Sequence, residues 1–179
     1  MSDKIQLLKS GINVAPIYWA LQSHPELWNR YRTRTERPDS PHREVDDIWV
    51  RYGDPERVLD GLPHDAYWYP DMDVLGIKQL CLDLMHMVGG TELGGVLITR
   101  IPPGKSVKPH IDNGWHARRY EKYAVQITSA PGQAFCFEDG SLETKPGDLY
   151  WFRNDVLHWV TNETPYERVS LIVCIRKEG

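Results

Sequence analysis

The chain has 179 residues, which is enough for one domain of ordinary size. Its hydrophobic content of 41% and charged content of 26% are typical of globular proteins and exclude wholesale disorder. With 21 basic against 25 acidic residues, the net charge of −4 gives no general attraction to nucleic-acid phosphates or anionic membranes, so we expect neither as a partner.

Neither a membrane span nor a secretory signal is predicted. The chain contains no run of about 18 apolar residues. Residues 1–10 have no apolar stretch followed by a small-residue cleavage site. The three cysteines are far apart and form no Cys-x-x-Cys pair, which favours buried thiols in a reducing compartment. We therefore expect a cytoplasmic protein.

The first part of the chain, residues 1–92, has a partly helical pattern. The segment 23–28 begins with serine and carries proline in its first turn, which is typical of a helix start. Residues 47–52 are rich in Ile, Trp and Val and predict a short strand. Residues 74–88 gather leucines on one surface before two glycines, and they predict the best-defined helix of the chain. This part is expected to form a cap and an extension of the sheet.

The remaining residues, 93–176, alternate apolar and polar positions between frequent turn signals. The predicted strands cover residues 96–101, 106–111, 123–128, 134–138, 142–144, 148–152, 158–162 and 168–175. Short strands at this spacing predict a double-stranded β-helix, a barrel of the jelly-roll or cupin type. The chain is thus expected to be a single domain, residues 1–179, mainly β with N-terminal helices packed on one outer sheet.

His110 and Asp112 form the most distinctive pair in the sequence. Residues two apart on a strand project to the same face, so this imidazole and this carboxylate can bind one metal ion together. A third ligand has to come from another strand, and His158 at the start of a predicted strand is the natural candidate. Two neutral histidines and one carboxylate leave three positions of an octahedron open, as ferrous iron requires when it binds a co-substrate and O₂.

Arg168 and Ser170 share a face of the last predicted strand. A guanidinium and a hydroxyl group there can hold a carboxylate through charge-assisted, bidentate contacts. An arginine that points into a barrel without an anion would be a buried unpaired charge, which is costly. The alternative is that Arg168 lies at a strand edge and points to solvent. Its position after the three candidate metal ligands favours the anion site.

The order of His-x-Asp, a distant His and Arg-x-Ser resembles the Fe(II)/2-oxoglutarate-dependent oxygenases. Residues 98–110 (ITRIPPGKSVKPH) and 145–152 (KPGDLYWF) are similar to the aspartyl/asparaginyl β-hydroxylase branch of these enzymes. The resemblance covers about residues 93–176, with weaker similarity at residues 40–42 and 47–51. On the same basis, His42 is expected to face the mouth of the barrel.

The resemblance implies a hydroxylase that uses Fe(II), 2-oxoglutarate and O₂. His110, Asp112 and His158 would then bind the iron. Oxidative decarboxylation of 2-oxoglutarate to succinate and CO₂ would accompany hydroxylation of an unactivated C–H bond. The expected substrate is an amino acid, a peptide side chain or a related small molecule.

The resemblance also implies how 2-oxoglutarate is held. Arg168 would pair with its distal carboxylate, with help from the hydroxyl groups of Ser170 and Thr99. Family members carry an Arg-x-His pair on the strand after the metal-binding loop, where this chain has lysine, tyrosine and alanine. We expect Lys122 to replace that arginine and to contact the near end of 2-oxoglutarate.

The segment 114–122 follows Asp112 closely and is rich in aromatic and basic residues. We expect it to form a mobile lid that selects the substrate, since loops on a rigid scaffold often carry binding. The candidate substrate-binding residues are Trp115, His116, Arg118, Arg119 and Tyr120. The alternative is a rigid surface turn whose arginines contact only solvent and neighbouring acids.

Two other functions use parts of the same pattern. The first is an oxygenase that acts on a nucleobase or nucleotide, for which a basic run would provide the contacts. That run comprises Arg30, Arg32, Arg34 and Arg37, and a solvated helix end near Glu44, Asp46 and Asp47 explains it better. The second is a cupin that binds metal without 2-oxoglutarate, because His158 and Asn162 fit a second cupin motif. Cupins usually offer His-x-His, however, and do not need Arg168.

Overall fold

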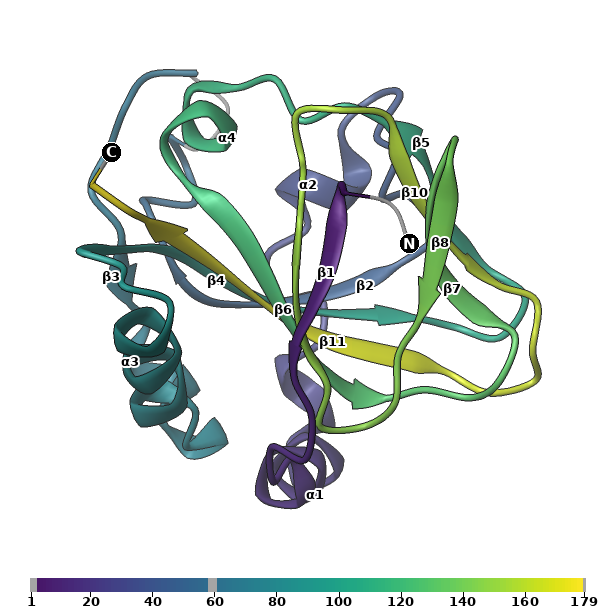
Figure 1. The fold of residues 1–179 in the computed structure, drawn as a ribbon. Helices are drawn as coiled ribbons and strands as arrows, with labels where there is room; N and C mark the ends of the chain where they lie inside the picture. Colours follow the sequence, from purple (N-terminus) through teal and green to yellow (C-terminus); the bar gives the residue numbers. More distant parts are fainter. Residues whose placement is uncertain (1–2, 58–60, 179) are drawn as a thin grey trace.

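Two antiparallel sheets face each other and form a barrel (Figure 1). The computed structural model describes residues 3–57 and 61–178. The large sheet has the strand order β1-β9-β6-β11-β4-β2-β3, and the small sheet has the order β5-β10-β7-β8. The strands are β1 (Ile5–Lys9), β2 (Asp46–Tyr52), β3 (Tyr67–Trp68), β4 (Glu92–Ile101), β5 (Ser106–His110), β6 (Glu121–Thr128), β7 (Gln133–Phe137), β8 (Gly140–Glu143), β9 (Leu149–Phe152), β10 (His158–Asn162) and β11 (Arg168–Arg176). The predicted double-stranded β-helix is confirmed.

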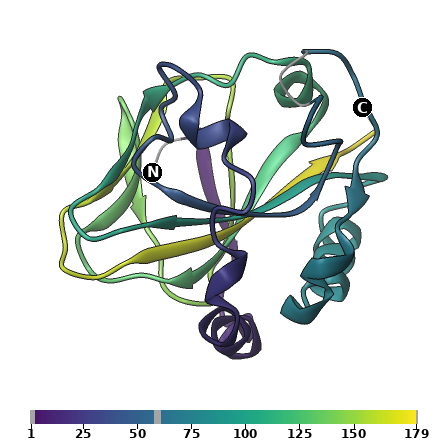
Figure 2. The ribbon, with the colours of Figure 1, turned by 180° about the vertical axis from the view of Figure 1, so that it is seen from behind.

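Helices cover the face of the large sheet that points away from the small sheet (Figures 1 and 2). The α-helices are α1 (Ala15–Ser23), α2 (Thr33–Glu36), α3 (Lys78–Met87) and α4 (Trp115–Arg119), and two 3₁₀ turns span Pro25–Leu27 and Pro70–Leu75. Of these, α1 and α3 lie under the large sheet, whereas α2 and α4 lie near the mouth of the barrel. No helix among the described residues is long and apolar enough to span a membrane.

The large sheet is buried on both faces, and this gives the molecule two apolar cores. On β11, Leu171, Val173 and Ile175 pack toward the helices in the first core. The alternate residues Ser170 and Ile172 face the barrel interior. The second core fills one end of the barrel with aromatic side chains from β7 and β9. Side chains alternate along a strand. One face of a single strand therefore packs in the apolar core, and its other face lines the cavity.

The structure corrects several expectations for the first part of the chain. No helix begins at Ser23; instead α1 ends there, and only one 3₁₀ turn follows. The predicted helix 74–88 is shorter, because Gly76 has a φ of 63° and separates the 3₁₀ turn from α3. The edge strand β1 was not predicted, since Ile5 is its only buried residue and it shows no alternation.

Candidate active site

A cavity of about 530 Å³ lies between the two sheets. Its walls come from the facing strands of both sheets, from the segment around α2 and from α4. Nine of the twelve residues predicted to form the site line it together: Trp115 and His116 from α4, and Thr99, His110, Asp112, Lys122, His158, Arg168 and Ser170. The barrel therefore gathers side chains from five separate strands, one loop and α4 into a single space.

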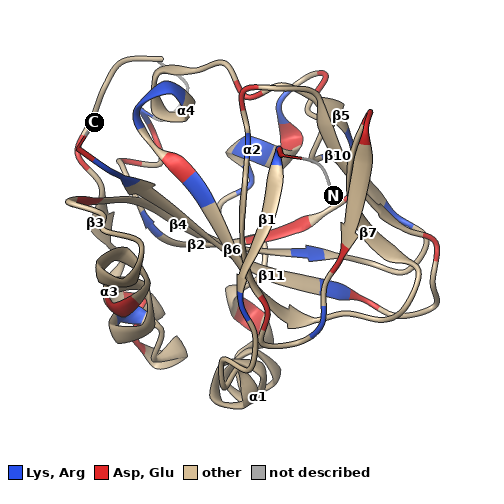
Figure 3. Ribbon diagram, in the orientation of Figure 1, with Lys and Arg blue, Asp and Glu red and all other residues tan. Residues whose placement is uncertain are grey.

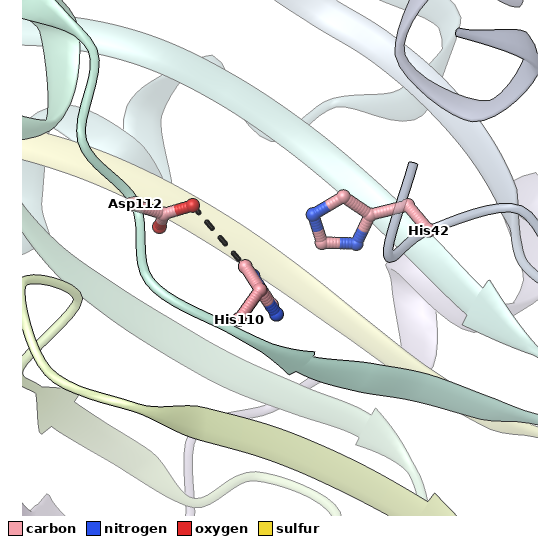
Figure 4. A group of neighbouring side chains, drawn as sticks. All are labelled: His42, His110 and Asp112. Atoms are coloured by element: carbon pink, nitrogen blue, oxygen red, sulfur yellow. Dashed lines mark ion pairs between the residues drawn. The ribbon is translucent and has the colours of Figure 1, made fainter. Parts of the chain in front are cut away.

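His110 and His158 meet across two paired strands of the small sheet. His110 ends β5, His158 begins β10, and the two residues are partners in the antiparallel register. Their ring centroids are 4.3 Å apart. Asp112 lies just beyond β5, where its backbone N–H donates to the carbonyl of Asn154 at 2.9 Å. A carboxylate oxygen of Asp112 is 3.6 Å from Nε2 of His110 (Figure 4).

Both histidines are held in the same tautomer. Nδ1 of His110 lies 2.8 Å from the carbonyl of Lys108, and Nδ1 of His158 lies 2.8 Å from the carbonyl of Val156. A carbonyl oxygen only accepts, so each Nδ1 carries the proton and each Nε2 keeps its lone pair. Burial lowers the pKa of His110 and lowers that of His158 to about 4. Both rings are therefore neutral at physiological pH, as metal ligands must be.

Asp112 is ionised and paired with Lys122, whose Nζ donates to its second oxygen. Burial alone would raise the pKa of Asp112, but the charge and the hydrogen bond of Lys122 lower it to about 2. Lys122 lies on β6 and lines the cavity beside the two histidines. The carboxylate thus has one oxygen toward His110 and the other toward the lysine.

His42 is a third histidine at this end of the cavity (Figure 4). The ligand atoms of His42, His110 and Asp112 all lie within 4.8 Å of one another. Burial and the nearby cations lower the pKa of His42 well below its usual value. The sequence suggested only that His42 faces the barrel mouth, whereas the group of closely spaced possible metal ligands among the described residues contains it in place of His158.

Arg168 lies in the barrel with neutral partners only. Its side chain donates to the hydroxyl oxygens of Ser170 at 2.9 Å, Tyr150 at 3.2 Å and Thr144 at 3.4 Å. Only 2% of the residue is exposed, and its Nε has no hydrogen-bond partner. No carboxylate of the described residues forms an ion pair with it. A buried guanidinium without a counter-charge is costly, so this pocket is built for an anion.

Thr99 lines the cavity, but its hydroxyl group is already hydrogen-bonded to the ion pair of Arg34 and Asp47. Its hydroxyl donates to Asp47 at 3.0 Å and accepts from Arg34 at 3.1 Å. Arg34 grips both oxygens of Asp47 at 2.8 and 2.9 Å, and Asp47 is fully buried. Burial opposes the charge of Arg34, but the attraction of Asp47 raises its pKa overall. The basic run was expected to be a solvated helix end near Glu44, Asp46 and Asp47; Arg34 does pair with Asp47, but this pair is largely buried rather than solvated.

The segment after Asp112 forms the short helix α4, which was expected to be a loop. Trp115 and His116 line the cavity. Nε2 of His116 accepts from the backbone N–H of Gly95 at 3.3 Å. A Cβ at Gly95 would come within 2.8 Å of the ring of Tyr52 and within 3.3 Å of His116. Glycine at this position therefore lets an aromatic wall lie directly against β4.

The other three residues predicted to bind the substrate are absent from the cavity lining. Arg118 donates to the carbonyl of Asn113 at 2.5 Å. Arg119 reaches Glu92 on β4 at 2.7 Å, and the hydroxyl of Tyr120 donates to the same carboxylate. Figure 3 shows the basic end of α4 beside the start of β6. The two contacts with Glu92 anchor the end of α4 to the large sheet.

The family described as aspartyl/asparaginyl β-hydroxylase matches residues 77–178, which is more than half of the chain. The chain belongs to this family. It is a 2-oxoglutarate-dependent hydroxylase. No curated protein matches its sequence.

Solved structures share the fold of this hydroxylase at low sequence identity. A prolyl hydroxylase from Trichoplax adhaerens, in complex with a hypoxia inducible factor peptide fragment, has a TM-score of 0.62 and 10% identity over 98% of this chain and 84% of its own. The viral collagen prolyl hydroxylase of Paramecium Bursaria Chlorella virus-1, in its 2-oxoglutarate complex, has a TM-score of 0.59 and 11% identity over 99% and 98%. A 2-oxoglutarate–Fe(II) oxygenase family oxidoreductase from Burkholderia pseudomallei has a TM-score of 0.57 and 12% identity over 75% and 68%.

Proposed function

We propose that this hydroxylase binds Fe(II) through His110, Asp112 and His158 and couples decarboxylation of 2-oxoglutarate to hydroxylation of an unactivated C–H bond. The donor set fits the metal, because two neutral imidazoles and one carboxylate suit ferrous iron with open positions. The backbone carbonyls that hold both Nδ1 atoms aim the two Nε2 lone pairs, a common feature around metal-binding histidines.

The buried, unpaired guanidinium of Arg168 is the observation that carries this proposal. It lies in the same cavity as the histidine pair and has three hydroxyl neighbours but no acid among the described residues. A dicarboxylate that reaches from the metal to Arg168 would neutralise this charge with one of its ends. Ser170 would contribute a further hydrogen bond there. Thr99 would contribute less to binding of 2-oxoglutarate than expected from the sequence, because its hydroxyl group already forms hydrogen bonds with Asp47 and Arg34.

The chain's own residues would bind, orient and shield the reactants. When bound, iron and 2-oxoglutarate supply the oxidising chemistry with O₂ as the oxidant, and succinate and CO₂ are the expected products. Lys122 is paired with Asp112, and we propose that it also contacts the near end of 2-oxoglutarate. The aromatic wall of Tyr52, Trp115 and His116 would exclude water from the substrate compartment.

The substrate we propose is an amino acid, a peptide side chain or a related small molecule. The family name refers to aspartyl and asparaginyl residues, and one structural neighbour was solved with a peptide fragment. A nucleic-acid substrate has less support than the sequence suggested. Three of its candidate contacts, Arg30, Arg32 and Arg34, pair with acids of this chain.

The test is a substrate screen with protein loaded with Fe(II) under anaerobic conditions. Free amino acids, peptides with aspartate or asparagine, and single-stranded DNA would each be added with 2-oxoglutarate and O₂. Succinate release with a product heavier by one oxygen atom supports the proposal, and the His110→Ala variant is the control. A protein that binds iron but shows no affinity for 2-oxoglutarate would instead be a metal-binding cupin.

A further inference from the structure

His42 lies on a segment that is attached to the strand carrying His110. The carbonyl of Pro41 accepts from the backbone N–H of Lys108 at 2.9 Å, two residues before His110. On the other side of His42, Glu44 forms an ion pair with Lys108 at 3.2 Å. The backbone N–H of His42 donates to the hydroxyl of Ser40 at 3.1 Å. The position of His42 relative to the metal-binding strand is therefore defined by contacts on both sides.

The imidazole of His42 faces the proposed metal ligands and has an unpaired nitrogen. Its ring lies edge-on to that of His110, with 4.8 Å between the centroids. Its Nδ1 is buried and has no hydrogen-bond partner among the described residues. A buried polar atom without a partner costs about 1–3 kcal/mol. This imidazole, which lies beside two proposed metal ligands, therefore has capacity for a further partner such as a bound ion.

We propose that His42 is a fourth protein ligand of the divalent metal while 2-oxoglutarate is absent. The inference rests on the proposed function, because it takes His110, Asp112 and His158 as the other ligands. Its basis is the approach of the ligand atoms of His42, His110 and Asp112 to within 4.8 Å of one another. His158 is taken as the remaining ligand because its ring centroid lies 4.3 Å from that of His110.

The coordination number of the metal ion then requires the His42 side chain to dissociate from the metal during turnover. Three protein ligands, two oxygens of 2-oxoglutarate and one O₂ fill an octahedron, so no position remains for a fourth protein ligand. His42 lies in a turn rather than in a strand, and a change of its side-chain rotamer would release the metal without disturbing either sheet. Binding of 2-oxoglutarate would thus replace His42.

The experiment measures Co(II) binding, by calorimetry and by visible absorption, with and without 2-oxoglutarate. The proteins compared are the unchanged chain, His42→Ala, His42→Gln and, as a matched control, His24→Ala, whose exposed ring pairs with Glu26. Without 2-oxoglutarate, both His42 variants should bind Co(II) about tenfold or more weakly and change its absorption spectrum. With 2-oxoglutarate, all four proteins should give the same spectrum. Circular dichroism verifies that each variant is folded.

Two results would overturn the inference. Unchanged affinity and spectrum in both His42 variants would show that His42 does not touch the metal. An equal loss of affinity with and without 2-oxoglutarate, at an unchanged spectrum, would mean that His42 only packs against His110. His110→Ala separates this failure from a failure of the proposed function: if His110→Ala also binds Co(II) normally, the metal centre itself is assigned wrongly.

Discussion

His158 lies directly opposite His110 in the antiparallel pair of β10 and β5, and the two imidazole rings are 4.3 Å apart. Residues 48 positions apart in the sequence therefore act as one unit. Each ring has its Nδ1 hydrogen-bonded to a carbonyl two residues earlier, so the register of the strands and the local hydrogen bond together define where each Nε2 lies.

The first prediction tests this pair. His110→Ala and His158→Ala should each abolish 2-oxoglutarate turnover and leave the fold largely intact, because each removes a proposed metal ligand from the end of a strand. Succinate release, metal content and circular dichroism are the measurements. His86→Ala, an exposed histidine on α3, is the control and should behave like the unchanged protein. Normal turnover in both site variants would refute the assignment.

The second prediction concerns Arg168. Arg168→Ala should raise the KM for 2-oxoglutarate and leave iron affinity nearly unchanged, because the arginine is proposed to hold the distal carboxylate. Loss of a charge-assisted hydrogen bond costs about 1.5–3 kcal/mol, or roughly 10- to 150-fold in KM. Arg153→Ala removes an exposed arginine paired with Asp155 and should have no effect. An unchanged KM in Arg168→Ala would place the carboxylate elsewhere.

The third prediction compares the residue Trp115 of α4, which lines the cavity, with two residues of α4 that do not line it. Trp115→Ala should lower coupled hydroxylation about tenfold or more while substrate-free decarboxylation of 2-oxoglutarate persists, because Trp115 lines the cavity. Replacing Arg118 and Arg119 together with alanine should change coupling much less, since neither lines the cavity. Succinate and hydroxylated product are quantified separately. If the double variant uncouples the reaction and Trp115→Ala does not, the arginines grip the substrate after all.

The fourth prediction concerns acid stability. Burial lowers the pKa of His116 to about 3, whereas a histidine in the unfolded chain has a pKa of about 6.5. Between these values the unfolded state binds more protons, so the free energy of unfolding falls as the pH drops, by at most about 1.4 kcal/mol per pH unit for this group. Urea unfolding between pH 7 and pH 4 measures the slope. His116→Gln should reduce it, and an equal slope in both proteins would contradict the prediction.

The fifth prediction compares two ion pairs of the basic run. Asp47→Ala leaves Arg34 without its partner at a buried site and should lower the free energy of unfolding by about 3–5 kcal/mol. Asp71→Ala removes an exposed partner of Arg30 and should cost at most about 1 kcal/mol. Chemical denaturation at neutral pH measures both. Equal losses would mean that the burial of Asp47 does not control the stability of its pair.

The strand pattern of residues 93–176 was predictable because it depends on local periodicity. Turn residues and alternating apolar positions are properties of neighbouring residues, so all eight strands expected there are present as β4 to β11. The first part was predicted less well. In β1 only Ile5 is buried, and the short helices α2 and α4 contain too few residues to show a helical period.

The sequence by itself also determined the chemistry of the proposed centre, because His110, Asp112, His158 and Arg168 are recognisable by residue type and spacing on strands. Only the tertiary structure decided which distant groups join them. His42 reaches His110 because the preceding residue is hydrogen-bonded to Lys108. Arg34 turns inward because the buried Asp47 attracts it. Such contacts depend on three-dimensional proximity and on the electrostatic cost of burial, and neither leaves a period or a motif in the sequence.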